Sequence, residues 1–259
     1  MGAIGLILLN MTIPRSNLPA VLRWTPSGRA VVFFLAAASI WCLLAEFYGL
    51  CSMRTFTLYV LIPATIVLVL MALLDFARGD RRLFRAVMIG AIGGLIAAFA
   101  YDIFRLPFVI AAADHTGPPW LRLPLFKVFP RFGAMILGQP FTAQQTDSQF
   151  TLFTHVVGWA YHFSNGITFG VMYMALVGEA SRRSWWWAIV LAVGLELAML
   201  FTPYTGFFGI GLTARFVIVT LSAHLIFGIA LGKYTRREAR RWPVSDGRGF
   251  EVGLAGATL

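Results

Sequence analysis

Six long apolar segments, separated by short runs rich in arginine, constrain this chain more than any other feature. Their approximate bounds are 30–50, 56–76, 84–108, 152–177, 185–204 and 215–231. A helix needs about 20 predominantly apolar residues to cross the hydrocarbon core of a bilayer, and each segment is close to that length. Only 12% of the 259 residues are charged, compared with about 25% in an ordinary soluble domain. The sequence therefore predicts an all-α, polytopic membrane bundle with six transmembrane helices.

The basic residues predict how this bundle is oriented. They cluster around 78–85, at 182–183 and in the tail at 233–241. Because cytoplasmic loops carry an excess of Lys and Arg, this pattern places both termini in the cytoplasm. The formal charge of +10 does not indicate nucleic-acid binding, since the basic residues lie between apolar segments rather than along one soluble face.

The same pattern divides the chain into three parts. We expect a cytoplasmic or interfacial segment over 1–29, a six-span transmembrane domain over 30–235, and a basic, disordered cytoplasmic tail over 236–259. The longest connection, residues 109–150, then lies on the outer side. It is rich in proline but also contains the apolar stretch LFKVFPRFGAMIL. We expect an amphipathic or re-entrant segment there, and the sequence leaves open whether 125–138 enters the membrane.

The fourth apolar segment carries polar and small residues on one side of a helix. The residues on this side are His155, His162, Asn165, Gly158, Gly166 and Gly170. The last segment repeats the spacing with His224, Gly228 and Gly232. A membrane helix turns such a face toward protein rather than lipid, so we expect these two helices to be partners around an intramembrane polar site. Gly90 and Gly94 predict similar close packing in the third segment.

Helical rise converts positions in the spans into depth. At about 1.5 Å per residue, His162 and His224 lie roughly 15 Å below the outer surface and Glu196 roughly 12 Å below it. A shallower tier, roughly 5 Å deep, contains Glu46, Asp102 and His155, with Arg105 at the surface. Asp102 and Arg105 are three residues apart on one helix and can pair locally. Glu196 has no basic neighbour on its own helix, so its partner must come from another one.

The sharpest hypothesis is a metal site formed by His162, His224 and Glu196, with His155 or Asn165 as a fourth ligand or a supporting group. Imidazoles and a carboxylate suit Fe, Zn or Cu. A b-type haem held by the first two histidines is an alternative, because the adjacent glycines leave room for a porphyrin. In a purely structural alternative, the histidines only connect helices through hydrogen bonds. The candidate partners are Glu196, Asn165, Thr220 and Ser222.

Three functions are compatible with these residues. The first is a metal-binding enzyme of redox or hydrolytic type that acts on a lipid-soluble substrate, with catalytic residues unknown. The second is a proton- or cation-coupled transporter that uses Glu196, Asp102 and the histidines as a relay. The third is an accessory subunit of a larger membrane complex. The glycine faces would then contact partner proteins or a second copy of the chain.

Two stretches also carry a resemblance to a known family. HFSNGITFGVMY at 162–173 and HLIFGIALGKY at 224–234 resemble the His-aromatic-x-x-Gly-x-x-x-Gly-x-x-Tyr helices of uncharacterised, YagU-like bacterial inner-membrane proteins. The second copy differs in that Tyr234 comes one residue early. The resemblance implies a multi-pass protein of the bacterial inner membrane and brings no reaction with it.

Overall fold

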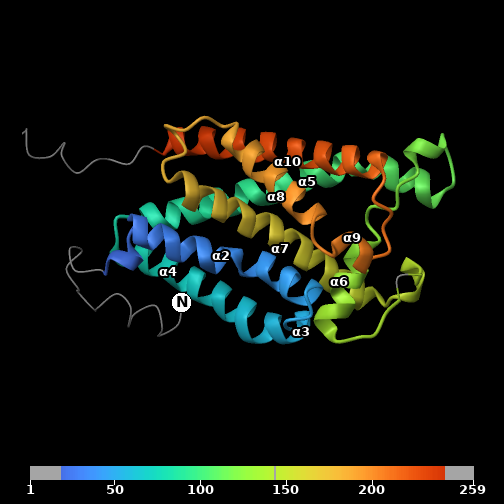
Figure 1. The fold of residues 1–259 in the computed structure, drawn as a ribbon. Helices are drawn as coiled ribbons and strands as arrows, with labels where there is room; N and C mark the ends of the chain where they lie inside the picture. The colour runs from blue at the N-terminus through green and yellow to red at the C-terminus, as the bar shows by residue number, and fades with distance from the viewer. Residues whose placement is uncertain (1–18, 143, 243–259) are drawn as a thin grey trace, which may run out of the picture.

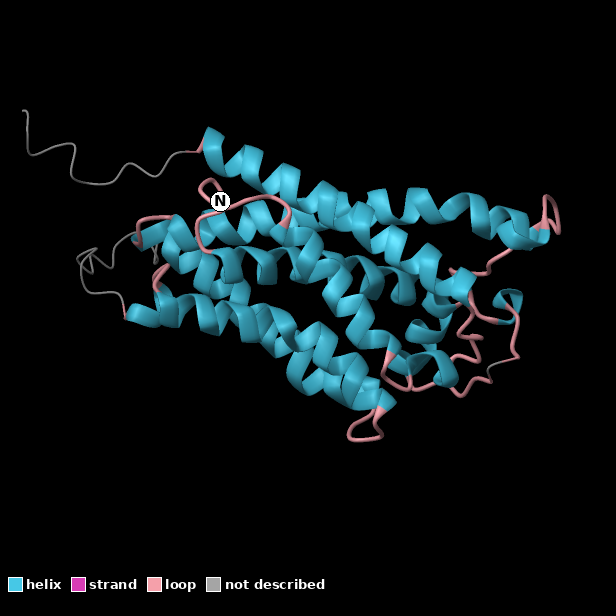
Figure 2. Ribbon diagram, turned by 45° about the horizontal axis from the view of Figure 1, so that its top comes forward, coloured by secondary structure: helices cyan, strands magenta, loops and turns pink. Residues whose placement is uncertain are grey.

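The computed structural model describes residues 19–142 and 144–242, and all regular structure in this part of the chain is helical (Figure 2). Most of the predicted segment 1–29 and the tail beyond residue 242 lie outside the described residues. Short helical turns also occur, at Ala20–Leu22, Pro119–Leu121 and Asp147–Gln149.

Six helical segments lie side by side in the described part of the chain (Figure 1). They are α2 (Pro26–Phe47), α3 (Met53–Phe56) continued by α4 (Ile62–Arg78), α5 (Arg82–Ala113), α7 (Leu152–Val177), α8 (Trp187–Leu200) and α10 (Ala214–Arg241). A π-helical stretch, Thr57–Leu61, joins α3 to α4 just before Pro63. Proline lacks a backbone N–H and its ring clashes with the carbonyl four residues earlier, so this local widening lets the helix continue past Pro63.

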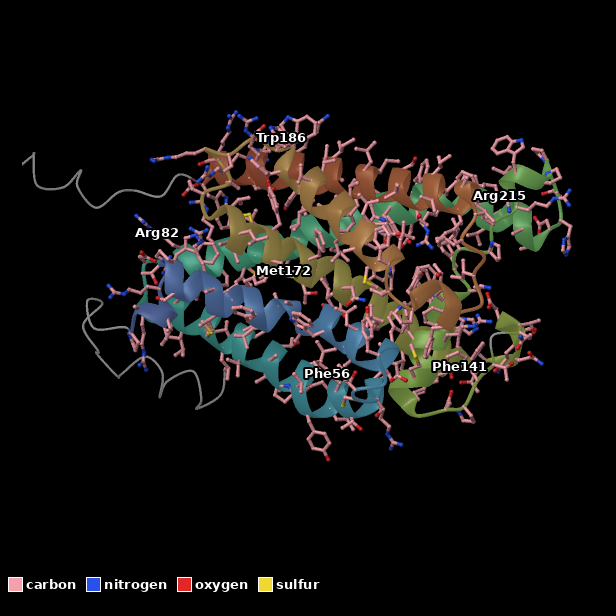
Figure 3. The ribbon with its side chains drawn as sticks, in the orientation of Figure 1. Phe56, Arg82, Phe141, Met172, Trp186 and Arg215 are labelled. Carbon is pink, nitrogen blue, oxygen red and sulfur yellow. The ribbon has the colours of Figure 1, made fainter. Side chains whose placement is uncertain are left out.

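One end of the bundle carries a cap, which we define as residues 114–151 and 201–213. It contains the short helices α6 (Val128–Leu137) and α9 (Tyr204–Phe207) (Figure 1). Arg215 and Phe141 lie at this end, whereas Arg82 and Trp186 lie toward the opposite end (Figure 3). The cap therefore covers the end of the bundle that the sequence analysis assigns to the outer side.

Four of the described helices are long and apolar enough to cross a membrane, judged by length and composition. They are Pro26–Phe47, Met53–Arg78, Arg82–Ala113 and Ala214–Arg241. Helix α7 coincides with the predicted segment 152–177, but its polar residues lower its hydropathy. Helix α8 has only 14 residues, a length of about 21 Å, because the predicted segment 185–204 is broken before α9.

The predicted start of the disordered tail, residue 236, is too early in the sequence. Residues 236–241 continue α10 as regular helix rather than forming part of a disordered segment. Arg, Glu and Ala favour helix strongly, and Arg241 Nη1 lies 3.2 Å from Glu238 Oε1 one turn earlier. Local propensity thus carries the helix beyond the apolar residues that were used to predict it.

Helix α6 is buried rather than spread over the surface of the cap. Eight of its residues, Val128 to Met135, are buried. It packs so closely on α7 that a Cβ added to Gly133 would overlap the carbonyl oxygen of Thr154, and one added to Gly158 would overlap that of Phe129. This backbone contact makes α6 part of the core beside the first half of α7.

Helix α7 lies at the centre and contacts α2, α5 and α6. Its contact with α5 is again backbone on backbone: a Cβ on Gly94 would overlap the carbonyl oxygen of Gly166, and a Cβ on Gly170 would overlap that of Gly90. At its C-terminal end, Arg29 donates from Nε and Nη2 to the carbonyls of Ala175 and Leu176 at 2.8 and 2.7 Å. These bonds satisfy carbonyls that a helix end leaves unpaired, so both the position and the end of α7 are well determined.

The glycine faces of α7 and α10 do not meet each other, contrary to the expected pairing. Gly228 and Gly232 on α10 instead face the backbone of Ile189 and the carbonyl of Trp185, at the beginning of α8. A glycine face permits close approach of any backbone, so its spacing predicts a close contact without specifying the partner. Both α7 and α10 pack on α5, which lies between them.

Candidate functional site

A cavity of about 170 Å³ lies inside the bundle near the cap, and we call it the central cavity. Side chains from α2, α5, α6, α7, α8, α9 and α10 line it. Most of the lining is apolar. The polar groups include Tyr101 and Arg105 from α5, His162 and Asn165 from α7, Glu196 from α8 and His224 from α10. The structure thus brings both predicted deep histidines, the predicted acid and Asn165 to one cavity.

His162 forms one histidine–carboxylate pair with Asp102. Its Nε2 lies 2.8 Å from Asp102 Oδ2, and Asp102 Oδ1 lies 3.5 Å from Arg105 Nη1. The Asp102–Arg105 pair is therefore present, as the spacing of three residues predicts. Arg105 also donates from Nη2 to the carbonyl of Leu125 at 2.6 Å, and its guanidinium lies 4.6 Å from the centre of the Tyr101 ring. Asp102 is thereby placed between an imidazole and a guanidinium, the arrangement that a buried carboxylate needs.

His224 forms the second pair, with Glu196. Its Nε2 lies 3.5 Å from Glu196 Oε2, and its Nδ1 lies 2.9 Å from the backbone carbonyl of Thr220. A carbonyl only accepts, so Nδ1 carries the hydrogen and Nε2 faces Glu196. The partner of Glu196 does come from another helix, and the backbone carbonyl of Thr220 holds the other ring nitrogen of His224.

The Tyr101 ring lies between the two pairs. Its centre is 4.9 Å from that of the His224 ring and 6.1 Å from that of the His162 ring. Sequence analysis missed this residue, although it directly precedes Asp102 and lies one helical turn before Arg105. It also missed Tyr204, which reaches the central cavity from α9. No local sequence pattern predicts that Tyr204 lines the cavity, because its inward position results from the break in the helix after α8.

Two buried polar atoms of the lining have no hydrogen-bond partner among the described residues. They are the side-chain Oδ1 of Asn165 and the Nε of Arg105. Buried polar atoms in folded proteins are almost always hydrogen-bonded. Asn165 and Arg105 therefore carry unused hydrogen-bonding capacity at the wall of the cavity.

A second cavity, of about 230 Å³, adjoins the first on the side of the cap, and we call it the vestibule. The two share Tyr101, Arg105, Glu196 and Tyr204 in their linings. The vestibule extends to Lys127, to the loop at 209–213 and to Arg215, which lies at the cap end in Figure 3. The polar groups of the central cavity thus continue toward the cap.

The opposite side of the central cavity is closed. Phe169 and Phe227 meet there edge to face with ring centres 5.2 Å apart. Beyond them, the backbones of α5 and α7 touch at Gly90 and Gly170. Continuous packing therefore separates the cavity from the end that carries Arg82.

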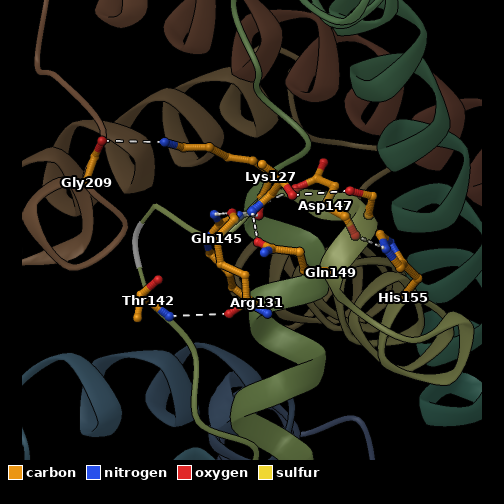
Figure 4. A network of polar contacts seen from close by, with 10 residues as sticks. Lys127, Arg131, Thr142, Gln145, Asp147, Gln149, His155 and Gly209 are labelled. Atoms are coloured by element: carbon orange, nitrogen blue, oxygen red, sulfur yellow. Dashed lines mark hydrogen bonds and ion pairs between the residues drawn. The ribbon is translucent and has the colours of Figure 1, made fainter.

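His155 and Glu46 lie away from the central cavity. His155 lies in the first turn of α7 and contacts the cap, because its Nε2 lies 3.0 Å from the carbonyl of Asp147 (Figure 4). Glu46 accepts a hydrogen bond from the backbone N–H of Met53 at the turn between α2 and α3. Seven residues of helix separate His155 from His162 by roughly 10 Å, so sharing a helix face does not place the two histidines at one site.

The cap is held together by Arg131, which is 1% exposed. It donates to the carbonyl of Gln145 at 2.5 Å and pairs with Asp147 at 3.6 Å (Figure 4). Lys127, one helical turn earlier, donates from Nζ to the carbonyl of Gly209 at 3.4 Å. Burial, and then the positive charge of Arg131, hold the pKa of Lys127 below its usual value, while Asp147 opposes this.

A metal or haem site requires the predicted ligands to meet around one space of sufficient size. Among the described residues, no three His, Cys, Asp or Glu side chains lie close enough together to hold one metal ion. The two histidines belong to separate pairs, and the central cavity is close in volume to engineered cavities that hold a single benzene ring, whereas a porphyrin has four pyrrole rings. Metal binding stays a prediction, and no step proposed below uses it.

Comparisons with known proteins identify no relative. The chain matches no family model, no curated protein and no solved structure. The functional argument therefore depends on the geometry of the two cavities.

Proposed function

We propose that the chain is an integral membrane protein of the bacterial inner membrane, with six spans and both termini in the cytoplasm. Six helical segments lying side by side support this topology, four of them long and apolar enough to span. Helix α7 would be the fourth span, its polar face covered by α5, and α8 with α9 the fifth. Basic residues such as Arg82 at the end opposite the cap support the orientation, and the burial of α6 supports a re-entrant segment.

The proposed activity is proton-coupled transport of a small solute that binds in the central cavity. The observation that carries this proposal is a pair of histidine–carboxylate contacts, His162 with Asp102 and His224 with Glu196. Both histidines and Glu196 line the central cavity. Histidine exchanges protons close to physiological pH, and ionisable groups inside a membrane commonly form proton relays. A solute beside these pairs changes their charge balance, so that solute binding and proton binding are coupled.

The asymmetry of the cavity supports a carrier that opens to one side at a time. The vestibule leads from the central cavity toward the cap, whereas Phe169, Phe227 and the glycine contacts close the other side. This arrangement corresponds to a state in which the solute exchanges with the outer side. Transport then requires a second state in which the contact between α5 and α7 opens.

Proton flux in liposomes tests the proposal. The purified protein is reconstituted with an internal pH-sensitive dye, and small carboxylates, amines and sugars are added outside in turn. We expect one of these classes to cause a proton flux that protein-free liposomes lack. Glu196→Gln and His162→Gln should abolish it, because each removes a proton-exchanging group but keeps a similar shape. His155→Gln is the matched control and should retain the flux, since His155 lies outside the cavity.

Two results would contradict the carrier. One is the absence of flux with every solute class, and the other is an unchanged flux in both cavity variants. The same samples also test the separate metal prediction by elemental analysis. About one equivalent of Fe, Zn or Cu, lost in Glu196→Gln, would favour a metal site over a proton pathway.

A further inference from the structure

The vestibule has an excess of positive charge. Arg105, Lys127 and Arg215 line it, and Glu196 is the acidic residue among its described lining. Glu196 is already paired with His224 at 3.5 Å. Charges in a cleft with low-dielectric walls act more strongly than charges on an open surface. The vestibule is therefore suited to attract an anion.

Arg105 lines this space and retains unused hydrogen-bonding capacity. Its Nη1 pairs with Asp102 and its Nη2 donates to Leu125, while its Nε has no hydrogen-bond partner among the described residues. The side chain is only 5% exposed. A guanidinium has five N–H donors, and a carboxylate is among the acceptors that match it best.

The central cavity next to the vestibule is suited to an apolar group. Aromatic and aliphatic side chains such as Phe129, Phe132 and Met199 form much of its wall. Its volume of about 170 Å³ is close to that of the roughly 150 Å³ engineered cavity that binds benzene. A ligand whose charged end lies beside Arg105 can thus place a ring-sized body in the central cavity against the wall that Phe129 and Phe132 form.

We propose that the two cavities together bind a small monocarboxylate with an apolar body about the size of a benzene ring. The carboxylate lies in the vestibule beside Arg105, Lys127 and Arg215, and the apolar body occupies the central cavity. This inference rests on the proposed function and names the substrate class of the carrier. An amine of the same size would add a further positive charge to the three cations of the vestibule, and inorganic phosphate has no apolar group to fill the central cavity.

Calorimetric titration of the purified protein with three probes tests the inference. Benzoate, benzyl alcohol and benzylamine share a ring and differ in charge. We expect benzoate to bind at least tenfold more tightly than the other two, and its affinity to fall as salt is added. Equal affinity for all three probes would overturn the proposal, because it would show that the ring binds without recognition of charge.

The two lysines of the chain provide a matched pair of variants. Lys127→Gln removes one charge from the vestibule and should weaken benzoate binding about fivefold to tenfold. Lys233→Gln makes the same chemical change near Trp185, at the opposite end, and should leave binding unchanged. Arg215→Gln should act like Lys127→Gln and replaces it if that variant does not fold. Equal effects of the vestibule variants and Lys233→Gln would refute the assigned position of the carboxylate.

The binding experiment and the proton-flux experiment can give different answers, so the substrate class and the carrier function can fail independently. Benzoate binding without any proton flux would support the anion site and contradict the carrier. Proton flux driven by an amine or a sugar, without benzoate binding, would support the carrier and overturn the substrate class.

Discussion

The close contact between α5 and α7 makes Gly94→Ala an informative substitution. A methyl group at this position would overlap the carbonyl oxygen of Gly166 and lie 2.9 Å from its carbonyl carbon. Both atoms belong to backbone, which cannot turn aside as a flexible side chain can. The two helices must therefore separate at Gly166, which lies one helical turn after His162 on α7.

The expected magnitude follows from two opposing effects. Alanine in place of glycine in a helix is favourable by about 0.5–1 kcal/mol, because glycine loses more backbone entropy on folding. Overpacking a close contact is unfavourable by about 1–3 kcal/mol. We expect a net loss of about 1–2 kcal/mol in the free energy of unfolding.

Gly194→Ala is the matched control. Gly194 lies within α8, and an added Cβ there would have no atom within 4 Å. Only the gain in helix propensity applies, so this variant should be more stable than the parent by about 0.5–1 kcal/mol.

Denaturant titration in detergent, followed by circular dichroism, measures both variants. The expected difference between them is about 2 kcal/mol. Widening the contact should also disturb the His162–Asp102 pair and reduce proton flux in Gly94→Ala alone. Equal stability of the two alanine variants would refute the reasoning, because it would mean that α5 and α7 do not meet at this glycine.

Two further predictions concern the orientation of the bundle and the attachment of its cap. Cys51, which is partly exposed, should react on intact cells with a membrane-impermeant maleimide, whereas Cys42, which is fully buried, should not; labelling that appears only after lysis would contradict the proposed orientation. Arg131→Met should weaken the attachment of 138–150 by about 1–2 kcal/mol and speed its limited proteolysis several-fold, whereas Arg122→Met, which changes an exposed side chain bonded to its own loop, should not; equal cleavage rates would argue against a role for Arg131.

Part of the site could be predicted because it depends on one helix at a time. The i, i+3 spacing of Asp102 and Arg105 placed them on one face, and they pair at 3.5 Å. Depth along the helix brought His162 and His224 to one level, and both line the central cavity. The same estimate could not show that His155, on the same helix face as His162, bonds to the cap instead.

The sequence by itself determined which segments are helical and apolar, as the agreement between 152–177 and α7 illustrates, because hydropathy and helix propensity act over neighbouring residues. Only the tertiary structure decided that Asp102 pairs with His162 and Glu196 with His224, that α5 lies between α7 and α10, and that α6 is buried. The physical reason is that a polar or glycine-rich face requires a partner without naming it. The partner is selected by packing between helices that are far apart in the chain, and a periodic pattern within one helix contains no record of that choice.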